Sequence, residues 1–328
     1  MTPKTELHVH LRGAMPLEFF GRQLKKYTVQ EALSTAPERF VKSFRGCAHL
    51  LPAIENGADD PRFLFAFDSF ETFLRSYLFS AYFVRDIDDF RGLAQAVRKE
   101  FEEQGLEYVE ITVSVFEYTM QGVPIEGIAE VLDEVASQPG VKIRWVVDLI
   151  RNLGPERCEQ TLREMLQQRP ASWVGITIGG NEGEFPPAQF ANCYDLARSE
   201  GLGLSVHAGE AAGPESVWDS LRVLKADRIG HGVRSIEDPA LVSHLAEHGI
   251  PLEVCLTGNV KTGVYASYEA HSLPELYAAG VKVTLNTDDP TFFRTTLSEE
   301  FAHAARLGLT PDDLAAFESN ARASAFGI

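Results

Sequence analysis

Short apolar runs alternate with longer amphipathic segments along most of the chain, and this alternation predicts strands separated by helices. Eight runs have the length and composition of strands: Glu6–His10, Glu107–Ser114, Ile143–Leu149, Val174–Ile178, Leu202–His207, Arg228–His231, Leu252–Leu256 and Val281–Thr287. Helical periodicity separates most of them, for example over Gly92–Gln104, Ile125–Ser137, Glu156–Gln168, Pro187–Glu200, Ser216–Lys225 and Pro239–His248. Eight successive strand and helix units predict an α/β fold, a parallel (β/α)8 TIM barrel.

One interval is far longer than the others. About 100 residues separate the first two strands, whereas a simple βαβ unit needs about 30. We therefore expect a lid-like helical insertion after strand 1, over about residues 40–100, within a single barrel domain that spans residues 1–328. Its segment Phe63–Leu74 is helical in period and rich in phenylalanine. Insertions of this kind lie at the catalytic face of a barrel, so these side chains either cover a site or pack the insertion's own core.

Composition narrows the possible partners. The formal net charge of −17 disfavours binding to nucleic acid or to anionic membranes. No apolar run is long enough to cross a bilayer, and Met1–Lys4 leads into the first strand without a signal-peptide core. The four cysteines form no C-x-x-C pair, which fits a reducing compartment. We expect a cytoplasmic protein, and its oligomeric state is left open.

Reactive residues recur where the predicted strands end. His8 and His10 lie two apart, so their side chains point to the same side of the first strand. His207, His231 and the pair Asp288-Asp289 end the fifth, sixth and eighth strands. Taken singly, such histidines are often core or half-exposed residues, and an Asp-Asp-Pro sequence often begins a turn or a helix. Because parallel strand ends meet at one mouth of a barrel, their joint occurrence indicates a metal site.

The donor types indicate which metal would bind. His8, His10, His207 and Asp288 would supply three nitrogens and one oxygen, a set suited to zinc with an open position for water. Two-metal barrel hydrolases commonly bridge their ions through a lysine of the fourth strand, and no lysine occurs over 174–180. One zinc ion per chain is therefore favoured, and it would acidify a water molecule that becomes the nucleophile.

Three further residues at these strand ends suit catalysis rather than metal binding. Glu210 lies three residues beyond His207, close enough to transfer a proton as general acid or base. His231 has no place among the four ligands, so we expect it to hydrogen-bond the nucleophile and orient it. Of the two adjacent aspartates, we assign Asp288 to the metal and Asp289 to the substrate.

Five motifs occur in order along nearly the whole chain: His8-Val9-His10-Leu11-x-Gly13-Ala14, His207-Ala208-Gly209-Glu210, His231-Gly232, Cys255-x-Thr257-x-Asn259 and Leu285-Asn286-Thr287-Asp288-Asp289-Pro290. Together they resemble the adenosine deaminase family of the amidohydrolase superfamily. The resemblance implies a zinc barrel that hydrolyses the 6-amino group of a purine and releases ammonia. It also implies that Glu210 protonates purine N1, that His231 orients the hydroxide, and that Asp289 accepts a bond from N7.

Two positions bear on the substrate. Family members that act on nucleosides have Gly-Asp-Glu after the fourth strand, and Gly180-Asn181-Glu182 aligns with it. Gly180 N–H is therefore expected to bind purine N3, although an ordinary glycine turn is the alternative. Asn181 puts in doubt any role for a carboxylate at its position.

Arg12 is the stronger departure from the family pattern. Adenosine deaminases resembling this chain have Asp there, beside the ribose 5′-hydroxyl, and adenine-specific relatives have Glu. A guanidinium has five donors and no acceptor, so we expect it to bind an anion at the 5′ end of the substrate. The alternative is that Arg12 pairs with an acidic neighbour such as Asp68 or Glu184.

The leading hypothesis is hydrolytic deamination of an adenine nucleoside with an anionic 5′ substituent, such as 6-amino-6-deoxyfutalosine of menaquinone biosynthesis. A 5′-nucleotide would also supply the charge. Adenosine or deoxyadenosine is the nearest alternative, and adenine is less favoured. A silent binding barrel is disfavoured because the ligands, Glu210 and His231 are all present. Another zinc hydrolase, such as an amidase, is disfavoured by Gly180 and Asp289, which suit a purine edge.

Overall fold

Eight parallel strands lie side by side in chain order in the computed structural model, which describes residues 3–328. They are β1 (Thr5–His10), β2 (Tyr108–Val113), β3 (Lys142–Asp148), β4 (Trp173–Thr177), β5 (Gly203–Ala208), β6 (Arg228–His231), β7 (Leu252–Val254) and β8 (Val283–Leu285). The predicted (β/α)8 barrel is confirmed. Strand β7 is shorter than predicted, because Leu256 already begins helix α13 (Leu256–Lys261). Strand β8 is also shorter than the predicted Val281–Thr287. The expectation about the N-terminus includes Met1 and Thr2, which lie outside the described residues.

The barrel closes at the carboxyl ends of its first and last strands. His10 N donates to Asp288 O at 2.8 Å, and Asp288 N donates to His8 O at 2.9 Å. Strand β1 also shifts register against β2 between Glu6 and Val9. There the Glu6 carboxylate accepts His8 N at 3.1 Å and Thr287 Oγ1 at 2.9 Å. The backbone that closes the barrel therefore belongs to three predicted metal ligands.

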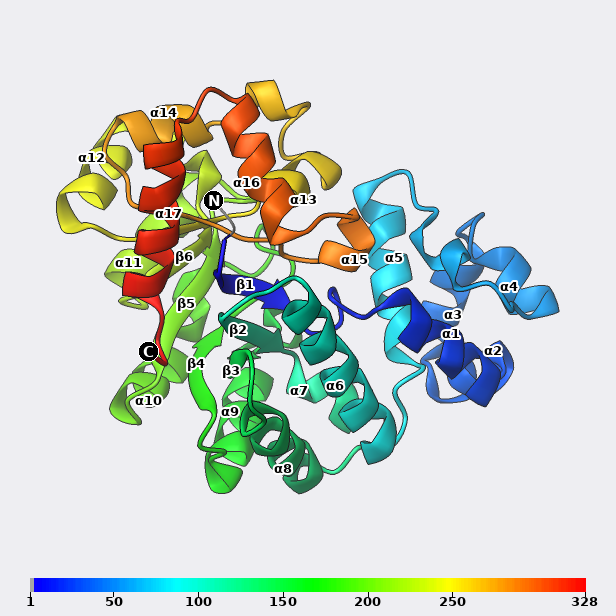
Figure 1. The fold of residues 1–328 in the computed structure, drawn as a ribbon. Helices are drawn as coiled ribbons and strands as arrows, with labels where there is room; N and C mark the ends of the chain where they lie inside the picture. The colour runs from blue at the N-terminus through cyan, green and yellow to red at the C-terminus, as the bar shows by residue number, and fades with distance from the viewer. Residues whose placement is uncertain (1–2) are drawn as a thin grey trace.

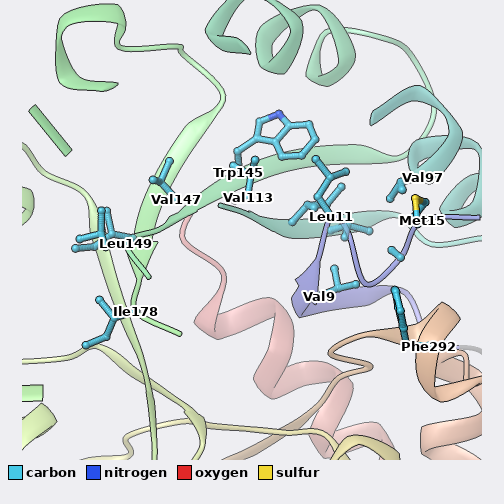
Figure 2. Packing of buried hydrophobic residues seen from close by; sticks show 14 of the residues in the cluster. Val9, Leu11, Met15, Val97, Val113, Trp145, Val147, Leu149, Ile178 and Phe292 are labelled. Carbon is cyan, nitrogen blue, oxygen red and sulfur yellow. The ribbon is translucent and has the colours of Figure 1, made fainter. Parts of the chain in front are cut away.

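The two faces of the sheet bury different kinds of side chain. Apolar side chains such as Val9 and Val147 pack outward, and Trp145 lies between β3 and the surrounding helices, where its Nε1 donates to Leu132 O at 2.9 Å (Figure 2). The interior is ionic. Arg228 on β6 contacts Glu110 on β2 at 2.6 Å and Glu253 on β7 at 2.5 Å. Because β2 and β6 are not neighbours, this contact crosses the barrel interior.

Helices connect successive strands around the outside of the barrel (Figure 1). They include α6 (Ile87–Glu103), α8 (Ile125–Ala136), α9 (Pro155–Gln168), α11 (Pro214–Arg222), α12 (Pro239–His248) and α14 (Leu273–Ala278), and α16 (Leu297–Arg306) follows the last strand. The predicted helix Pro187–Glu200 is divided into a 3-10 turn at Pro187–Phe190 and helix α10 (Ala191–Ser199). Among residues 3–328, no helix is both long and apolar enough to cross a membrane.

The insertion begins at Leu17, earlier than the expected residue 40, ends at Ala81 before α6, and lies at one side of the barrel (Figure 1). It contains α1 (Leu17–Lys26), α2 (Val29–Ala32), α3 (Glu38–Arg45), α4 (Leu51–Asn56), a 3-10 turn at Pro61–Phe65 and α5 (Phe70–Ala81). A continuous helix over Phe63–Leu74 is therefore wrong. Ser69 starts α5 instead, because its hydroxyl accepts Thr72 N in a capping box and its backbone is extended.

The insertion's aromatic side chains pack in two places. Phe63 packs inside the insertion against Phe79, with ring centroids 6.0 Å apart. Phe65 instead packs on Phe292, at 5.0 Å, and Phe73 packs on Phe293, at 4.9 Å. These two partners belong to α15 (Pro290–Phe293), the short helix directly after Asp288 and Asp289. The insertion therefore buttresses one wall of the barrel mouth.

The opposite end of the barrel is filled by the segment that follows α17 (Pro311–Ser324). The Phe326 ring lies 3.6 Å from the Arg228 guanidinium carbon. A Cβ added to Gly203 would lie 2.3 Å from this ring, and one added to Gly175 would lie 2.8 Å away. These two strand glycines are therefore required by the close approach of Phe326.

We expect Gly203→Ala to destabilise the protein by about 1–3 kcal/mol, since an added methyl group would overpack the Phe326 ring. The loss should shrink by about 1 kcal/mol or more when Phe326→Ala is also present, as a double-mutant cycle of urea unfolding would measure. Gly21→Ala is the control, because its Cβ would meet only Pro61 at an ordinary 3.5 Å. Additive effects of Gly203→Ala and Phe326→Ala would contradict this account.

Candidate active site

Four side chains from three strand ends converge at the mouth of the barrel. His8, His10, His207 and Asp288 each offer a ligand atom, and these atoms all lie within 4.8 Å of one another. His10 Nε2 lies 3.3 Å from His207 Nε2 and 3.3 Å from Asp288 Oδ1. His8 Nε2 lies 3.8 Å from the same oxygen. The structure thus brings together the four residues that the sequence proposed as ligands.

The donor set fits a metal ion. His8 Nδ1 lies 2.8 Å from Glu253 Oε2, and His207 Nδ1 lies 3.0 Å from Thr177 Oγ1, so both rings are held from behind. His8 Nε2 is buried and has no hydrogen-bond partner among the described residues. Anchored Nδ1 atoms with Nε2 atoms turned to a common point are typical of histidine metal ligands.

Close packing and a strained backbone fix these side chains. A Cβ added to Gly230 would lie 2.9 Å from His8 Cε1, so β6 passes His8 more closely than any other residue type would allow. His231 and Asp288 have φ of +59° and +63°. Residues other than glycine rarely adopt such φ values, because this backbone conformation is strained. The strain is tolerated where the surrounding contacts enforce the conformation.

Burial sets the charge state of two of the histidines. It lowers the pKa of His207 well below the ordinary value. It also lowers the pKa of His8, although the hydrogen bond with Glu253 opposes the shift. For Glu253, burial acts upward, but the charge of Arg228 and the bond from His8 bring its pKa down to about 2. Neutral imidazoles and an ionised carboxylate behind one of them suit metal binding.

Glu210 and His231 face each other beside this cluster. Glu210 Oε2 lies 3.7 Å from His231 Nε2. Burial raises the pKa of Glu210 above its ordinary value, and the charge of Asp288 adds to this. A carboxyl group that retains its proton near neutral pH can act as a general acid. His231 also forms a second possible metal group with Cys255 and Asp288.

The Glu210 loop is held by a carboxylate that the sequence analysis did not identify. Glu182 accepts hydrogen bonds from four successive backbone amides: Gly209 at 2.6 Å, Glu210 at 3.2 Å, Ala211 at 2.9 Å and Ala212 at 2.8 Å. Such bonds to a buried carboxylate are strong and fix a loop. Asn181 has no carboxylate, but the neighbouring Glu182 has one, and its role in this loop is structural.

Gly180 lies in the same loop, with φ of +113°. A Cβ there would lie 2.1 Å from Asn152 Oδ1, which accepts Asn181 N at 2.8 Å. Both the backbone conformation and this close approach require glycine. Gly180 N–H has no protein partner among residues 3–328.

Asp289 lies beside the metal group but outside it. A Cβ added to Gly13 would lie 1.9 Å from Asp289 Oδ1, so the glycine of the first motif makes room for this carboxyl group. Burial raises the pKa of Asp289 well above its ordinary value, and the charge of Asp288 adds to this. Oδ1 has no hydrogen-bond partner among the described residues.

Arg12 is 3% exposed and forms an ion pair with Glu117 of helix α7 (Val115–Thr119). The structure therefore shows the alternative expected from the sequence, an internal acidic partner, but this partner is Glu117 and not Asp68 or Glu184. Nothing in the sequence singles out Glu117, because α7 follows β2 and meets Arg12 only in the folded barrel. The guanidinium also lies 4.3 Å from the centroid of the Tyr77 ring and donates to Tyr77 O at 3.2 Å. Its Nε has no partner among the described residues.

Three further residues behind the site, Asn259, His271 and Glu253, were also missed. Asn259 lies 3.2 Å from His231 Nδ1, and His271 lies 3.1 Å from Asn259. Asn259 could have been found, because it lies in the Cys255-x-Thr257-x-Asn259 motif. His271 and Glu253 carry no signal of their own, since an isolated histidine or a strand glutamate is ordinary in sequence.

A barrel with a buried His3Asp cluster and an adjoining carboxyl group defines a metal-dependent hydrolase of the amidohydrolase type. The family model described as adenosine deaminase matches residues 3–327. The chain belongs to the adenosine deaminase family, and it is a hydrolytic deaminase that acts on C–N bonds of purines.

Its relatives differ in substrate. The chain is 35% identical to adenine deaminase of Sinorhizobium fredii over 98% of its length and 94% of the relative. It is also 35% identical to aminodeoxyfutalosine deaminase of Streptomyces avermitilis, over 93% and 81% of the two chains. Adenosine deaminase of Serratia proteamaculans is 33% identical, over 99% and 94%.

Solved structures share the fold. Adenine deaminase from Arthrobacter aurescens superposes with a TM-score of 0.85 at 24% identity, covering 100% of this chain and 95% of that one. An amidohydrolase from Burkholderia ambifaria with bound Zn gives 0.82 at 23% identity, covering 99% and 86%.

The buried carboxyl group of Glu300 holds the backbone of α13, and its ionisation can be tested. Its carboxyl group is fully buried and accepts Thr257 N at 3.1 Å and Thr295 Oγ1 at 2.6 Å. Burial raises its pKa to about 7, against the opposing effect of these hydrogen bonds. The folded protein therefore keeps a proton that the unfolded chain releases, and the contribution of this group to stability falls as pH rises from about 4.5 to 7.

We expect the stability of Glu300→Gln, measured relative to that of the unmodified protein, to increase as pH rises from about 5 to about 8. The total change in this difference should be up to about 3 kcal/mol. Urea unfolding at several pH values measures this difference, and Glu299→Gln on the same helix is the matched control. A difference that stays constant with pH would show that Glu300 ionises normally.

Proposed function

We propose that this protein hydrolyses the 6-amino group of an adenine nucleoside that carries an anion on its 5′ side, and that 6-amino-6-deoxyfutalosine is its substrate. The deaminase reaction follows from the family, and the single observation that supports the substrate is Arg12. This buried guanidinium lies two residues beyond His10 and has an unpartnered Nε. An anion would supply the missing acceptor in a charge-assisted hydrogen bond.

His8, His10, His207 and Asp288 would hold one zinc ion. When bound, zinc lowers the pKa of a coordinated water and so supplies a nucleophile near neutral pH. Glu210, whose pKa is raised by burial, would donate a proton to purine N1 and make C6 more electrophilic. The products are the 6-oxopurine and ammonia, so one water is consumed and no oxidant is needed.

Asp289 would hold the other edge of the purine. N7 of an adenine nucleoside carries a lone pair and no proton, so it can only accept a hydrogen bond. The raised pKa of Asp289, caused by burial and by Asp288, favours a protonated carboxyl group that donates to N7. This reverses the direction of the bond expected from the family resemblance. Gly180 N–H would donate to N3 from the loop after β4.

A second candidate is adenosine, and the Arg12–Glu117 pair favours it. The pair leaves this part of the site without net charge, and Glu117 is a hydrogen-bond acceptor close to the position where relatives have Asp or Glu. In this case Arg12 would only hold Glu117 in place, and Glu117 would accept a bond from the 5′-hydroxyl.

Two variants separate metal binding from proton transfer. We expect His10→Ala to lose both bound zinc and ammonia release, because it removes a ligand. Glu210→Gln should keep about one zinc ion per chain while kcat falls by about 10²–10⁴-fold, the range for a general acid. Elemental analysis and an ammonia assay measure the two quantities. Glu210→Gln protein without zinc, or with unchanged kcat, would remove Glu210 from the proposed role.

Removing the charge on either side of the ion pair tests the substrate. Arg12→Gln should lower kcat/KM for aminodeoxyfutalosine by about 10-fold or more, since a charge-assisted bond contributes about 1.5–3 kcal/mol. Glu117→Gln should raise it, because a competing carboxylate is removed. Adenosine, which lacks the anion, is the matched control substrate, and adenine and a 5′-nucleotide complete the series.

The second candidate makes the opposite prediction for Glu117. If adenosine is the substrate, Glu117→Gln lowers kcat/KM for adenosine and gives no gain with any anionic compound. Equal or better kcat/KM of the unmodified protein for adenosine would also refute the anionic substrate.

A further inference from the structure

A buried chain of three hydrogen bonds links a backbone amide of helix α14 to His231. Leu273 N donates to His271 Nδ1 at 3.0 Å. His271 Nε2 lies 3.1 Å from Asn259 Oδ1, and Asn259 Nδ2 lies 3.2 Å from His231 Nδ1. Asn259, His271 and His231 are 0%, 3% and 1% exposed, so water does not compete for these bonds.

The first bond fixes the direction of the other two. A backbone N–H can only donate, so His271 Nδ1 must accept and the ring proton must lie on Nε2. His271 Nε2–H then donates to Asn259 Oδ1, and the amide presents its N–H to His231 Nδ1. Burial, which lowers the pKa of His271 to about 3, keeps this ring neutral. His231 Nδ1 therefore accepts a hydrogen bond and carries no proton.

We propose that Asn259 and His271 are positioning residues that hold His231 in the tautomer with its proton on Nε2. That nitrogen is the one that faces Glu210 Oε2, at 3.7 Å. His231 then meets the reacting atoms as an N–H donor, which can orient the oxygen of the attacking water. It does not act as a base, because Nε2 already has a proton and Nδ1 is occupied by Asn259. This role rests on the proposed deaminase site.

The His271 ring is held firmly enough to set the direction of this series of hydrogen bonds. Its ring lies against Tyr265, with centroids 4.4 Å apart. Tyr265 Oη donates to Val233 O at 3.2 Å and lies 2.7 Å from Ser272 Oγ. A ring held on one face and bonded at both nitrogens cannot turn over without breaking both hydrogen bonds.

Asn259→Asp tests the chain with the smallest change in shape. One oxygen still accepts from His271, while the other replaces the donor to His231 with an acceptor. We expect ¹⁵N NMR of the zinc-loaded, full-length protein to show His231 protonated on Nε2, and protonated on Nδ1 in Asn259→Asp. With the tautomer reversed, kcat should fall by about 10²–10⁴-fold, while KM changes by less than about 10-fold.

His271 variants give a second comparison if Asn259→Asp fails to fold. His271→Gln can still donate to Asn259 and should retain the Nε2–H tautomer, whereas His271→Leu should lose it. His244→Gln, on helix α12, is the control for loss of a distant histidine. A proton on His231 Nδ1 in the unmodified protein would overturn the proposal, and so would an unchanged tautomer in Asn259→Asp or in His271→Leu. The tautomer is read without substrate, so failure of the proposed substrate leaves this test intact.

Discussion

A line of buried charge through the barrel interior is the constraint on which the rest of the site depends. Arg228 binds Glu110 on one side and Glu253 on the other, and Glu253 in turn holds His8. Buried charges are tolerated only when paired, and the loss of one partner costs about 3–5 kcal/mol. Phe326 covers Arg228 from the end of the barrel opposite the site. The pairing that makes a charged interior stable therefore also orients a metal ligand.

The backbone contacts that close the barrel also hold the proposed metal ligands next to one another. The backbone of Asp288 pairs with His8 and His10 across the last seam of the sheet. Asp288 and His231 both have positive φ, a strain that the surrounding contacts must enforce. Without this seam, Asp288 would not be held beside His8 and His10, and the four proposed ligands would have no common point for a metal.

The residues proposed for the reaction and the residues proposed for the substrate lie in different parts of the molecule. The residues proposed for chemistry lie at strand ends, where the sheet fixes them. The contacts of Arg12 come instead from Tyr77 in the insertion and Glu117 after β2. Segments outside the barrel strands can change without disturbing the ligands, which is consistent with relatives of different substrate at similar identity.

The sequence by itself determined the strands, because a parallel strand buried on its outer face appears as a short apolar run. It also determined the candidate ligands, since His8 and His10 share a side of one strand and the other ligands end later strands. It did not determine where the insertion's helix is interrupted before Ser69, because a capping hydroxyl overrides a periodic pattern there. Tertiary structure alone decided that Glu117 pairs with Arg12, that Glu253 holds His8 and that His271 reaches His231 through Asn259. Contacts between residues so distant in the chain exist only after the barrel has closed, and no local pattern encodes them.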